Sequence, residues 1–235
     1  GTGVVTIGAL IGMAAHLENK GGSVLDQTGL AQKGGAVTTH VRIAKTPDDI
    51  HAVRIAAGEA DLVLGCDMVV VNDYWALSKI RAERSHVVLN DYQAMPGTFP
   101  RETDMQFPAK DIIAAIATGL GGRQPLQVAG TELALALMGD AIATNLLMLG
   151  YAWQKGLVPL SFESTMRAVE LNGADIEMNK KAFAWGRMAA HDMAGVQAAA
   201  GMGASVHAAD FLGDAHSATE LAFVGEGKLS QSLDE

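Results

Sequence analysis

Cysteine is nearly absent from this sequence, since Cys66 is the single one among 235 residues. One thiol excludes an intrachain disulfide, and alone it cannot hold an iron–sulfur cluster or a four-cysteine zinc site. The scarcity of cysteine fits a reducing compartment, so we expect a cytoplasmic protein. Cys66 stands in an apolar run, which predicts an inert thiol.

Runs of basic residues are also missing. Lysine and arginine number 17 against 26 aspartates and glutamates, for a formal net charge of −9. Nucleic-acid binding needs a basic face that displaces counterions from phosphates, so the composition argues against nucleic acid as a partner. The seven histidines do not cluster, and no spacing typical of a metal site occurs. We therefore predict no metal ligands and, in the absence of a recognisable triad, no catalytic residues.

Long uninterrupted hydrophobic runs are missing too. The longest apolar stretch, near 132–149, contains Asp140 and Asn145, so we expect a buried helix and no membrane partner. The chain nevertheless has ample material for a core, because 49% of its residues are hydrophobic and only 18% are charged. This composition excludes a disordered chain.

Apolar periodicity alternates between helix and strand up to about residue 154 and is helical afterwards. The order predicts an α/β protein with a three-layer α/β/α arrangement around a parallel or mixed sheet, followed by C-terminal helices. The expected strands are 23–26, 36–44, 61–66, 86–90 and 125–129, and the expected helices are 4–19, 73–83, 110–119, 131–154, 161–172 and 175–199.

The two ends of the chain suggest a piece of a longer polypeptide. It opens within a glycine-rich segment, and it stops at 232–235, which resembles a helix N-cap with its helix cut short. From Gly201 to Gly227 the sequence becomes loose and rich in glycine, alanine and histidine. We therefore expect a folded domain over 1–199 and a linker or arm over 200–235 that leads to the next domain.

Glycine-rich turns provide two candidate binding segments. Gly1 and Gly3 precede the first expected helix, where backbone N–H groups and the helix dipole favour a phosphate or carboxylate. The alternative is a tight turn without a ligand. The second segment joins two expected strands and carries a hydroxyl, an amide and an ammonium among glycines; its candidate residues are Thr28, Gly29, Gln32, Lys33, Gly34 and Gly35.

We expect that second segment at the carboxyl ends of sheet strands, where α/β proteins bind ligands. Lys33 would hold a phosphate or carboxylate, and Gln32 would orient a carbonyl. The alternative is a solvated loop whose glycines serve only turn geometry.

Two asparagines complete the candidate site. Asn90 ends the buried strand 86–90, so it faces either a ligand or the backbone that it holds in place. Asn145 lies in an otherwise apolar helix, where a buried amide must find partners, and we expect a neighbouring loop first and a ligand second.

Four collinear segments support a family resemblance: GTGVVTIGALIGMAAHLENKG, DQTGLAQKGGAVTTHVRIA, GEADLVLGCDMVV and MGDAIATNLLMLGYAWQKGLVPLS. They resemble the gamma-type domain of 2-oxoacid:ferredoxin oxidoreductases, in particular the long single-chain bacterial indolepyruvate branch. The resemblance covers residues 1 to about 195 and is most specific in TGLAQKGGAV and GDAIATNLLMLGYAWQKG.

The resemblance implies oxidative decarboxylation of a 2-oxoacid to an acyl-coenzyme A, with electrons passed to ferredoxin. It implies that thiamine diphosphate, Mg²⁺ and 4Fe–4S clusters lie on other domains, and that this domain closes over the active site and assists with coenzyme A. The expected partners are the other domains of the same polypeptide, a second copy in a homodimer, and ferredoxin.

Two other readings stay open. The chain is a free-standing dinucleotide-binding module, in which Asp26 would bind a ribose hydroxyl, or it is a purely structural docking domain. The sequence upstream of Gly1 would distinguish the dinucleotide-binding module from a domain of the oxidoreductase family. A purely structural docking domain would show no effect of coenzyme A on its thermal stability.

Overall fold

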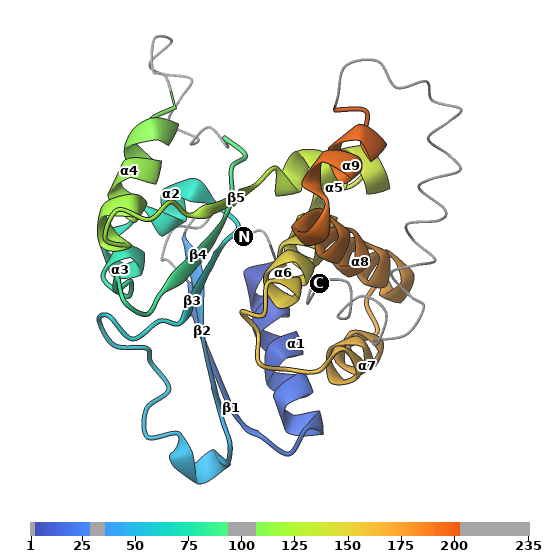
Figure 1. The fold of residues 1–235 in the computed structure, drawn as a ribbon. Coiled ribbons are helices and arrows are strands. Elements are labelled where there is room, and N and C mark those ends of the chain that lie inside the picture. The colour runs from blue at the N-terminus through green and yellow to red at the C-terminus, as the bar shows by residue number, and fades with distance from the viewer. Residues whose placement is uncertain (1–2, 29–35, 94–106, 203–235) are drawn as a thin grey trace. The chain divides into compact units, whose positions relative to one another are not determined.

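The computed structural model describes residues 3–28, 36–93 and 107–202. The chain divides into two units, Gly1–Ala129 and Gly130–Glu235. Figure 1 shows the described residues in colour, with strands in the first unit and helices alone in the second. Among the described helices, none combines the length and the apolar character needed to cross a membrane.

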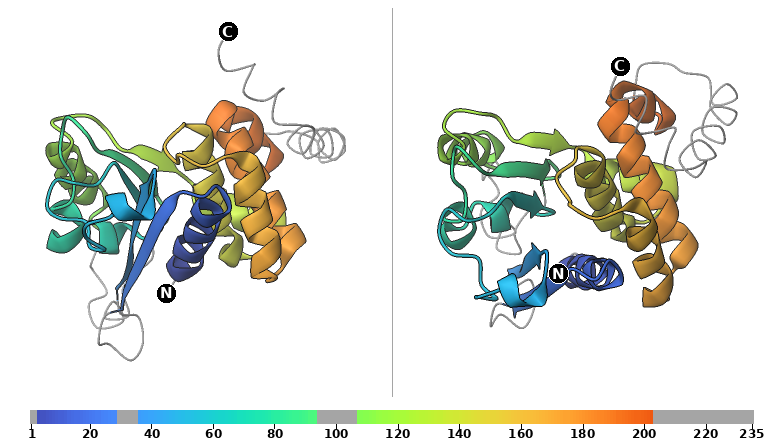
Figure 2. Two further views of the ribbon diagram at one scale, coloured as in Figure 1. Left: turned by 90° about the horizontal axis from the view of Figure 1, so that it is seen from below. Right: turned by 60° about the horizontal axis from the view of Figure 1, so that its bottom comes forward.

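The first unit begins with helix α1 (Val4–Leu17), which packs on a hairpin of two antiparallel strands, β1 (Gly21–Thr28) and β2 (Val37–Ala44). The helix lies along the hairpin in every view (Figures 1 and 2). Glycine permits this close approach, since a Cβ atom on Gly12 would stand 2.7 Å from Val24 Cγ2. The helix expected at 4–19 is thus confirmed, two residues shorter at its end.

A parallel sheet follows, with strand order β3 (Leu62–Gly65), β4 (His86–Asn90) and β5 (Leu126–Val128). The 3-10 turn η1 (Pro47–Asp49) lies between β2 and β3. Two one-turn helices, α2 (Met68–Val71) and α3 (Tyr74–Leu77), separate β3 from β4, and α4 (Ala109–Gly119) precedes β5.

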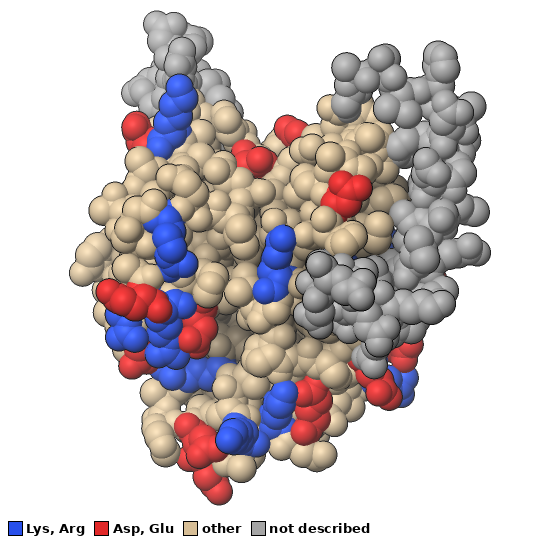
Figure 3. Space-filling view, viewed as in Figure 1, with Lys and Arg blue, Asp and Glu red and all other residues tan. Residues whose placement is uncertain are grey.

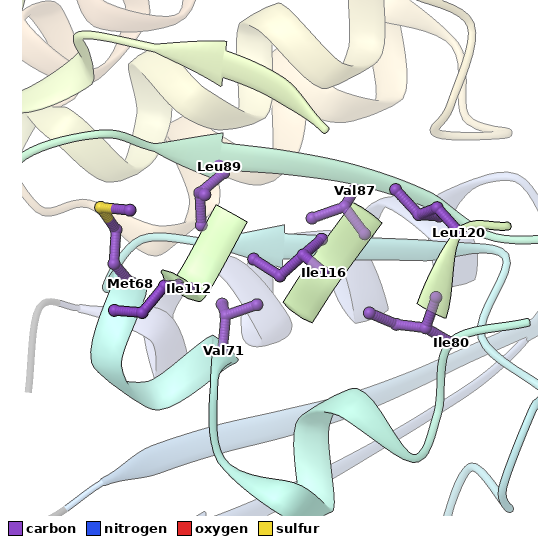
Figure 4. Packing of buried hydrophobic residues seen from close by; sticks show 8 residues of the cluster. All are labelled: Met68, Val71, Ile80, Val87, Leu89, Ile112, Ile116 and Leu120. Atoms are coloured by element: carbon purple, nitrogen blue, oxygen red, sulfur yellow. The ribbon is translucent and has the colours of Figure 1, made fainter. Parts of the chain in front are cut away.

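One core holds this sheet to its helices. Val87 and Leu89 of β4 face Ile112 and Ile116 of α4 (Figure 4). The full cluster is Met68, Val71, Ile80, Val87, Leu89, Ile112, Ile116 and Leu120. Val88, on the opposite face of β4, has no exposed surface either. β4 is therefore buried on both faces, as its unbroken apolar run predicts.

The α/β class with a parallel sheet is confirmed, but the five expected strands do not form one sheet. β1 and β2 pair with each other, and β3, β4 and β5 form a separate sheet. The connection between β1 and β2 has eight residues, which is too short for the crossover that parallel neighbours need, so these strands turn back as a hairpin.

The second unit is helical among its described residues. It contains α5 (Gly130–Met138), the 3-10 turn η3 (Ala141–Ala143), α6 (Thr144–Gln154), α7 (Phe162–Asn172), α8 (Ile176–His191) and α9 (Met193–Ala199). α6 and α8 pack against each other along much of their lengths (Figure 2). Trp153, Phe162 and Phe183 form an aromatic cluster, with ring centroids 5.9–6.2 Å apart.

Three further expected helices are much shorter or are broken. The helix expected at 131–154 stops at Gly139, whose φ of 74° is left-handed, and restarts where Asp140 caps Ile142 N. The helix expected at 175–199 breaks at Asp192, which accepts from Gly195 N at 2.9 Å. In both cases a capping aspartate begins a new helix inside continuous helical periodicity. The helix expected at 73–83 retains the single turn α3.

Charged side chains of both signs are interspersed on the face shown in Figure 3. Arg42 pairs with Glu59, Arg84 with Asp61, and Lys180 and Arg167 with Glu170. Each of these pairs sets a positive side chain against a negative one.

Candidate functional site

The carboxyl edge of the parallel sheet is the candidate site in the first unit. Gly65 of β3 pairs with Leu89 of β4, and Asn90 of β4 pairs with Val128 of β5, so the three strands end close together. Residues that follow parallel strands meet at this edge, and open α/β sheets bind their ligands there. Cys66 and Asp67 follow β3, and Asp91 follows β4.

Asn90 lies at the end of the middle strand, as the sequence predicted. Its side chain is buried, and Nδ2 donates a 3.0 Å hydrogen bond to the carbonyl oxygen of Cys66. This bond ties the end of β4 to the end of β3. Asp91 N donates to Val128 O at 3.0 Å and joins β4 to β5 at the same level. The Asn90 side chain therefore binds the backbone of the neighbouring strand end, which is one of the two roles expected for it.

Asp67 is a residue of this edge that the sequence analysis did not single out. Its Oδ1 accepts from Val69 N at 2.8 Å and from Val70 N at 3.3 Å, and it caps the single turn of α2. The signal was present in the sequence, because an aspartate directly after an apolar strand and before an apolar run is a typical N-cap.

Cys66 is buried between these groups. Burial raises the pKa of its thiol to about 12, and the nearby Asp67 carboxylate acts in the same direction. The raised pKa keeps the thiol protonated at neutral pH, so the inert cysteine predicted from the sequence stays the expectation at this edge. The described residues of this edge thus supply hydrogen-bonding groups and a helix cap rather than an activated nucleophile.

Gly3 takes the position expected for the first glycine turn. It is the N-cap of α1 with φ 71°, and its carbonyl oxygen accepts from Thr6 N at 3.0 Å. A left-handed φ of this kind favours glycine. The tight turn is confirmed, whereas a bound anion at this turn stays a prediction. Gly1 lies outside the described residues.

Thr28 is the last residue of β1 and pairs with Val37 of β2. The other candidates of this segment, Gly29, Gln32, Lys33, Gly34 and Gly35, lie outside the described residues. The expected place of the segment is wrong, because it joins antiparallel strands and does not follow a strand of the parallel sheet. A ligand role for these residues remains a prediction, but strand-end geometry no longer supports it.

The same hairpin argues against the hypothesis of a dinucleotide-binding module. Asp26 would bind a ribose at the end of a parallel strand, but β1 is antiparallel to β2 and Asp26 Oδ1 accepts from Thr39 Oγ1 at 2.6 Å. A dinucleotide fold needs a strand, a helix and a second parallel strand. α1 is followed instead by the hairpin.

Asn145 belongs to the second unit, in the first turn of α6. Only 4% of the residue is exposed, and no donor among the described residues reaches its Oδ1. Thr144, beside it, donates to Ala141 O at 2.6 Å. The buried amide predicted from the sequence is confirmed, but the neighbouring loop expected to satisfy it is not seen among the described residues.

Among the described residues, no three histidine, cysteine, aspartate or glutamate side chains are grouped so that they could hold a metal ion. Parallel strands with polar residues at their carboxyl edge, together with the helices that pack on them, define the class: an α/β protein. The chain belongs to the pyruvate ferredoxin/flavodoxin oxidoreductase family, whose profile matches residues 1–189.

The relatives agree with this family. The chain is 30% identical over 185 residues to indolepyruvate oxidoreductase subunit IorB of Methanothermobacter thermautotrophicus, which covers 78% of this chain and 89% of that protein. It is 26% identical over 198 residues to the IorB subunit of Pyrococcus horikoshii, covering 82% and 93%.

Solved structures share the fold. The gamma subunit of a keto/oxoacid ferredoxin oxidoreductase from Geobacter sulfurreducens matches with a TM-score of 0.54 at 19% identity, covering 81% of this chain and 92% of that one. Pyruvate oxidoreductase subunit PORC from Thermotoga maritima matches with a TM-score of 0.55 at 16% identity, covering 80% and 90%. The gamma-type resemblance stated from the sequence is confirmed.

Proposed function

We propose that the chain is the gamma-type part of an enzyme that oxidatively decarboxylates indolepyruvate or another arylpyruvate and reduces ferredoxin. The similarity to an IorB subunit, 30% identity along 89% of that subunit, carries the proposal. The family match supports the coarser class, a component of a 2-oxoacid ferredoxin oxidoreductase. The aryl substrate rests on the relatives' names.

In this proposal the cofactors lie elsewhere in the enzyme. Thiamine diphosphate with Mg²⁺ and the 4Fe–4S clusters, held by other domains, would supply the decarboxylation chemistry and the electron transfer, with coenzyme A as the acyl acceptor. Cluster ligation requires several thiolates, whereas this chain has Cys66 alone, buried and with its pKa raised to about 12. The donor set of the chain therefore fits a supporting role.

We further propose that residues 1–199 form the gamma-type domain and that 200–235 lead to another domain of the same polypeptide. The family match ends at residue 189 and the last described helix, α9, ends at Ala199, so the remaining residues lie beyond both. The partners in this proposal are the other domains of the enzyme, a second copy in a cytoplasmic homodimer, and ferredoxin.

Turnover assays test whether the reaction needs the other domains of the enzyme. The isolated chain, given indolepyruvate, thiamine diphosphate, Mg²⁺, coenzyme A and a viologen dye, should reduce no dye above a blank. The full-length enzyme should reduce it, and should prefer indolepyruvate or phenylpyruvate to pyruvate and 2-oxoglutarate. Dye reduction by the isolated chain contradicts the supporting role, and a preference for pyruvate contradicts the aryl substrate.

Coenzyme A contact is a separate part of the proposal. Lys33→Ala in the full-length enzyme should raise the KM for coenzyme A more than the KM for the 2-oxoacid, because the ammonium group would hold a phosphate. Lys45→Ala, at an exposed lysine just after β2, serves as the control. An unchanged KM for coenzyme A in Lys33→Ala would assign this lysine to the structure of its loop.

A further inference from the structure

His40 connects the hairpin of the first unit to the chain segment that follows it. The residue lies in β2, is 8% exposed, and places its Nε2 3.0 Å from Gln27 Oε1 on β1. On the other side of the ring, Ile55 N donates to Nδ1 at 3.2 Å. Ile55 belongs to the irregular connection 50–57, which leads from η1 toward β3.

These two contacts fix the protonation state of the ring. The backbone N–H of Ile55 can only donate, so Nδ1 must carry its lone pair. Gln27 Oε1 can only accept, so the proton of the neutral ring sits on Nε2. The hydrogen-bond network therefore requires a neutral imidazole.

The surroundings of the ring oppose a second proton. Arg42 on β2, Arg54 on the connection and Lys79 beyond α3 are positive; together with burial, which has the largest effect, they lower the pKa of His40. The acids of the packed elements are already engaged. Asp26 on β1 accepts from Thr39 Oγ1 at 2.6 Å, and Glu59, just after the connection, accepts from Arg42 Nη2 at 2.7 Å.

Arg42 of β2 also attaches this stretch of chain to the hairpin, both through Arg54 and through Glu59, whose Oε2 accepts from Ala56 N at 3.4 Å. Arg42 Nη2 donates to Arg54 O at 2.9 Å, next to the His40 contact. The residues just after this segment bond elsewhere: Gly58 N donates to Ser78 O at 2.9 Å and Ala60 N donates to Lys79 O at 3.1 Å, in the α3 region. Residues 51–54 and 56–57 are exposed, whereas Ile55 is partly buried.

We propose that His40 is a proton-controlled latch: the neutral ring holds Ile55 and the connection 50–57 against the β1–β2 hairpin, and the protonated ring releases them. A proton on Nδ1 points a donor at the Ile55 N–H, so that bond must break. The added charge also stands among Arg42, Arg54 and Lys79. Residues 50–57 then separate from the hairpin while the parallel sheet keeps its own hydrogen bonds.

Hydrogen exchange on the 235-residue chain between pH 7.5 and 5 tests the latch. After correction for the intrinsic pH dependence of exchange, the Ile55 amide should lose protection about tenfold per pH unit once the ring titrates. Amides of β4, which lie in the core of the sheet, should keep theirs. Unchanged protection of Ile55 down to pH 5, with His40 shown by NMR to be protonated there, would overturn the proposal.

Two variants make the test specific. His40→Gln removes the titrating ring, so exchange at 50–57 should become independent of pH over this range. His51→Gln replaces an exposed histidine on the connection itself and should keep the pH dependence of the unmodified chain. A pH-dependent opening that persists in His40→Gln, or disappears in His51→Gln, contradicts the latch. If His40→Gln does not fold, the NMR titration of the unmodified chain decides alone, because the loss of Ile55 protection must then accompany protonation of the ring over the same pH range.

Discussion

Gly150 of α6 and Gly186 of α8 occupy matching positions where the two helices cross. A Cβ atom on Gly150 would collide with the carbonyl oxygen of Phe183, and one on Gly186 would collide with the carbonyl oxygen of Leu147. Each glycine thus lies against the backbone of the other helix. Backbone at a helix crossing has little freedom to move, so this contact fixes the distance between α6 and α8.

Gly186→Ala should therefore lower the stability of the second unit by about 2–3 kcal/mol, because overpacking outweighs the better helix propensity of alanine. Chemical denaturation followed by circular dichroism measures the change. Gly119→Ala in α4 is the matched control, since its Cβ atom would meet Ile80 at an ordinary 3.5 Å. Equal stabilities of the two variants would show that the crossing tolerates a methyl group.

Arg187 of α8 makes contacts that depend on the planar shape of its guanidinium group. The residue is 2% exposed, Nε donates to Gln154 Oε1 at 2.8 Å, and the guanidinium carbon lies 4.8 Å from the ring centroids of both Trp153 and Phe162. Arg187→Lys keeps the charge but loses the planar group that stacks and donates. We expect a loss of about 2 kcal/mol or more in the free energy of unfolding.

A conservative variant separates these contributions. Gln154→Glu places a carboxylate opposite the arginine and should keep most of the stability, whereas Gln154→Leu leaves Nε without this acceptor and should lose stability as Arg187→Lys does. An Arg187→Lys protein as stable as the parent would indicate that the guanidinium plane contributes nothing here.

Apolar patterning was enough to locate the three strands of the parallel sheet and the helices α1, α4 and α7. The run HVVLN became β4 with the predicted bounds, and Asn90 ended it as predicted. Patterning failed where a single residue interrupts a continuous apolar face. Asp140 and Asp192 cap new helices inside continuous helical periodicity. A hydrophobic pattern does not show that one helix ends and another begins there.

The separate hairpin was missed for a related reason. Period-two alternation identifies a strand but not its neighbour, so β1 and β2 were assigned to the same sheet as β3. The connection between Thr28 and Val37 is too short for a parallel crossover, so its length could have predicted the hairpin. At the candidate site, Asn90 could be predicted from its strand end, whereas the bond between His40 and Ile55 depends on a long irregular connection that no pattern specifies.

The Cys66 thiol should resist modification in the folded chain. Its pKa is raised to about 12 by burial, so less than about one molecule in a thousand carries a thiolate at pH 8. Ellman's reagent should react slowly with the native protein and rapidly after unfolding in guanidinium. Fast, stoichiometric reaction without denaturant would show that this edge of the sheet is open to solvent.

Acid should weaken the ion pair between Asp61 and Arg84. Arg84 donates through Nε and through Nη2, the latter at 2.9 Å to Oδ2, and these hydrogen bonds lower the pKa of Asp61. A lowered carboxyl pKa contributes stability above the unfolded value, near 4, and that contribution is lost as the pH falls further. Since the pair is largely exposed, it contributes no more than about 1 kcal/mol. Asp61→Asn should flatten the stability profile between pH 4 and pH 3, and an unchanged slope would assign that loss to other carboxylates.

Asn90 should be more sensitive to charge than to truncation. In Asn90→Asp an ionised carboxylate would face the Cys66 carbonyl oxygen, to which Nδ2 now donates at 3.0 Å, in a place where 2% of the residue is exposed. We expect Asn90→Ala to cost about 1–3 kcal/mol for the lost hydrogen bond, and Asn90→Asp to cost more at pH 7. Protonation restores the donor, so the gap between the two variants should narrow as the pH falls toward 5. Urea denaturation at both pH values measures this, and an aspartate variant as stable as the parent at pH 7 would mean that a ligand or solvent donor reaches the strand end.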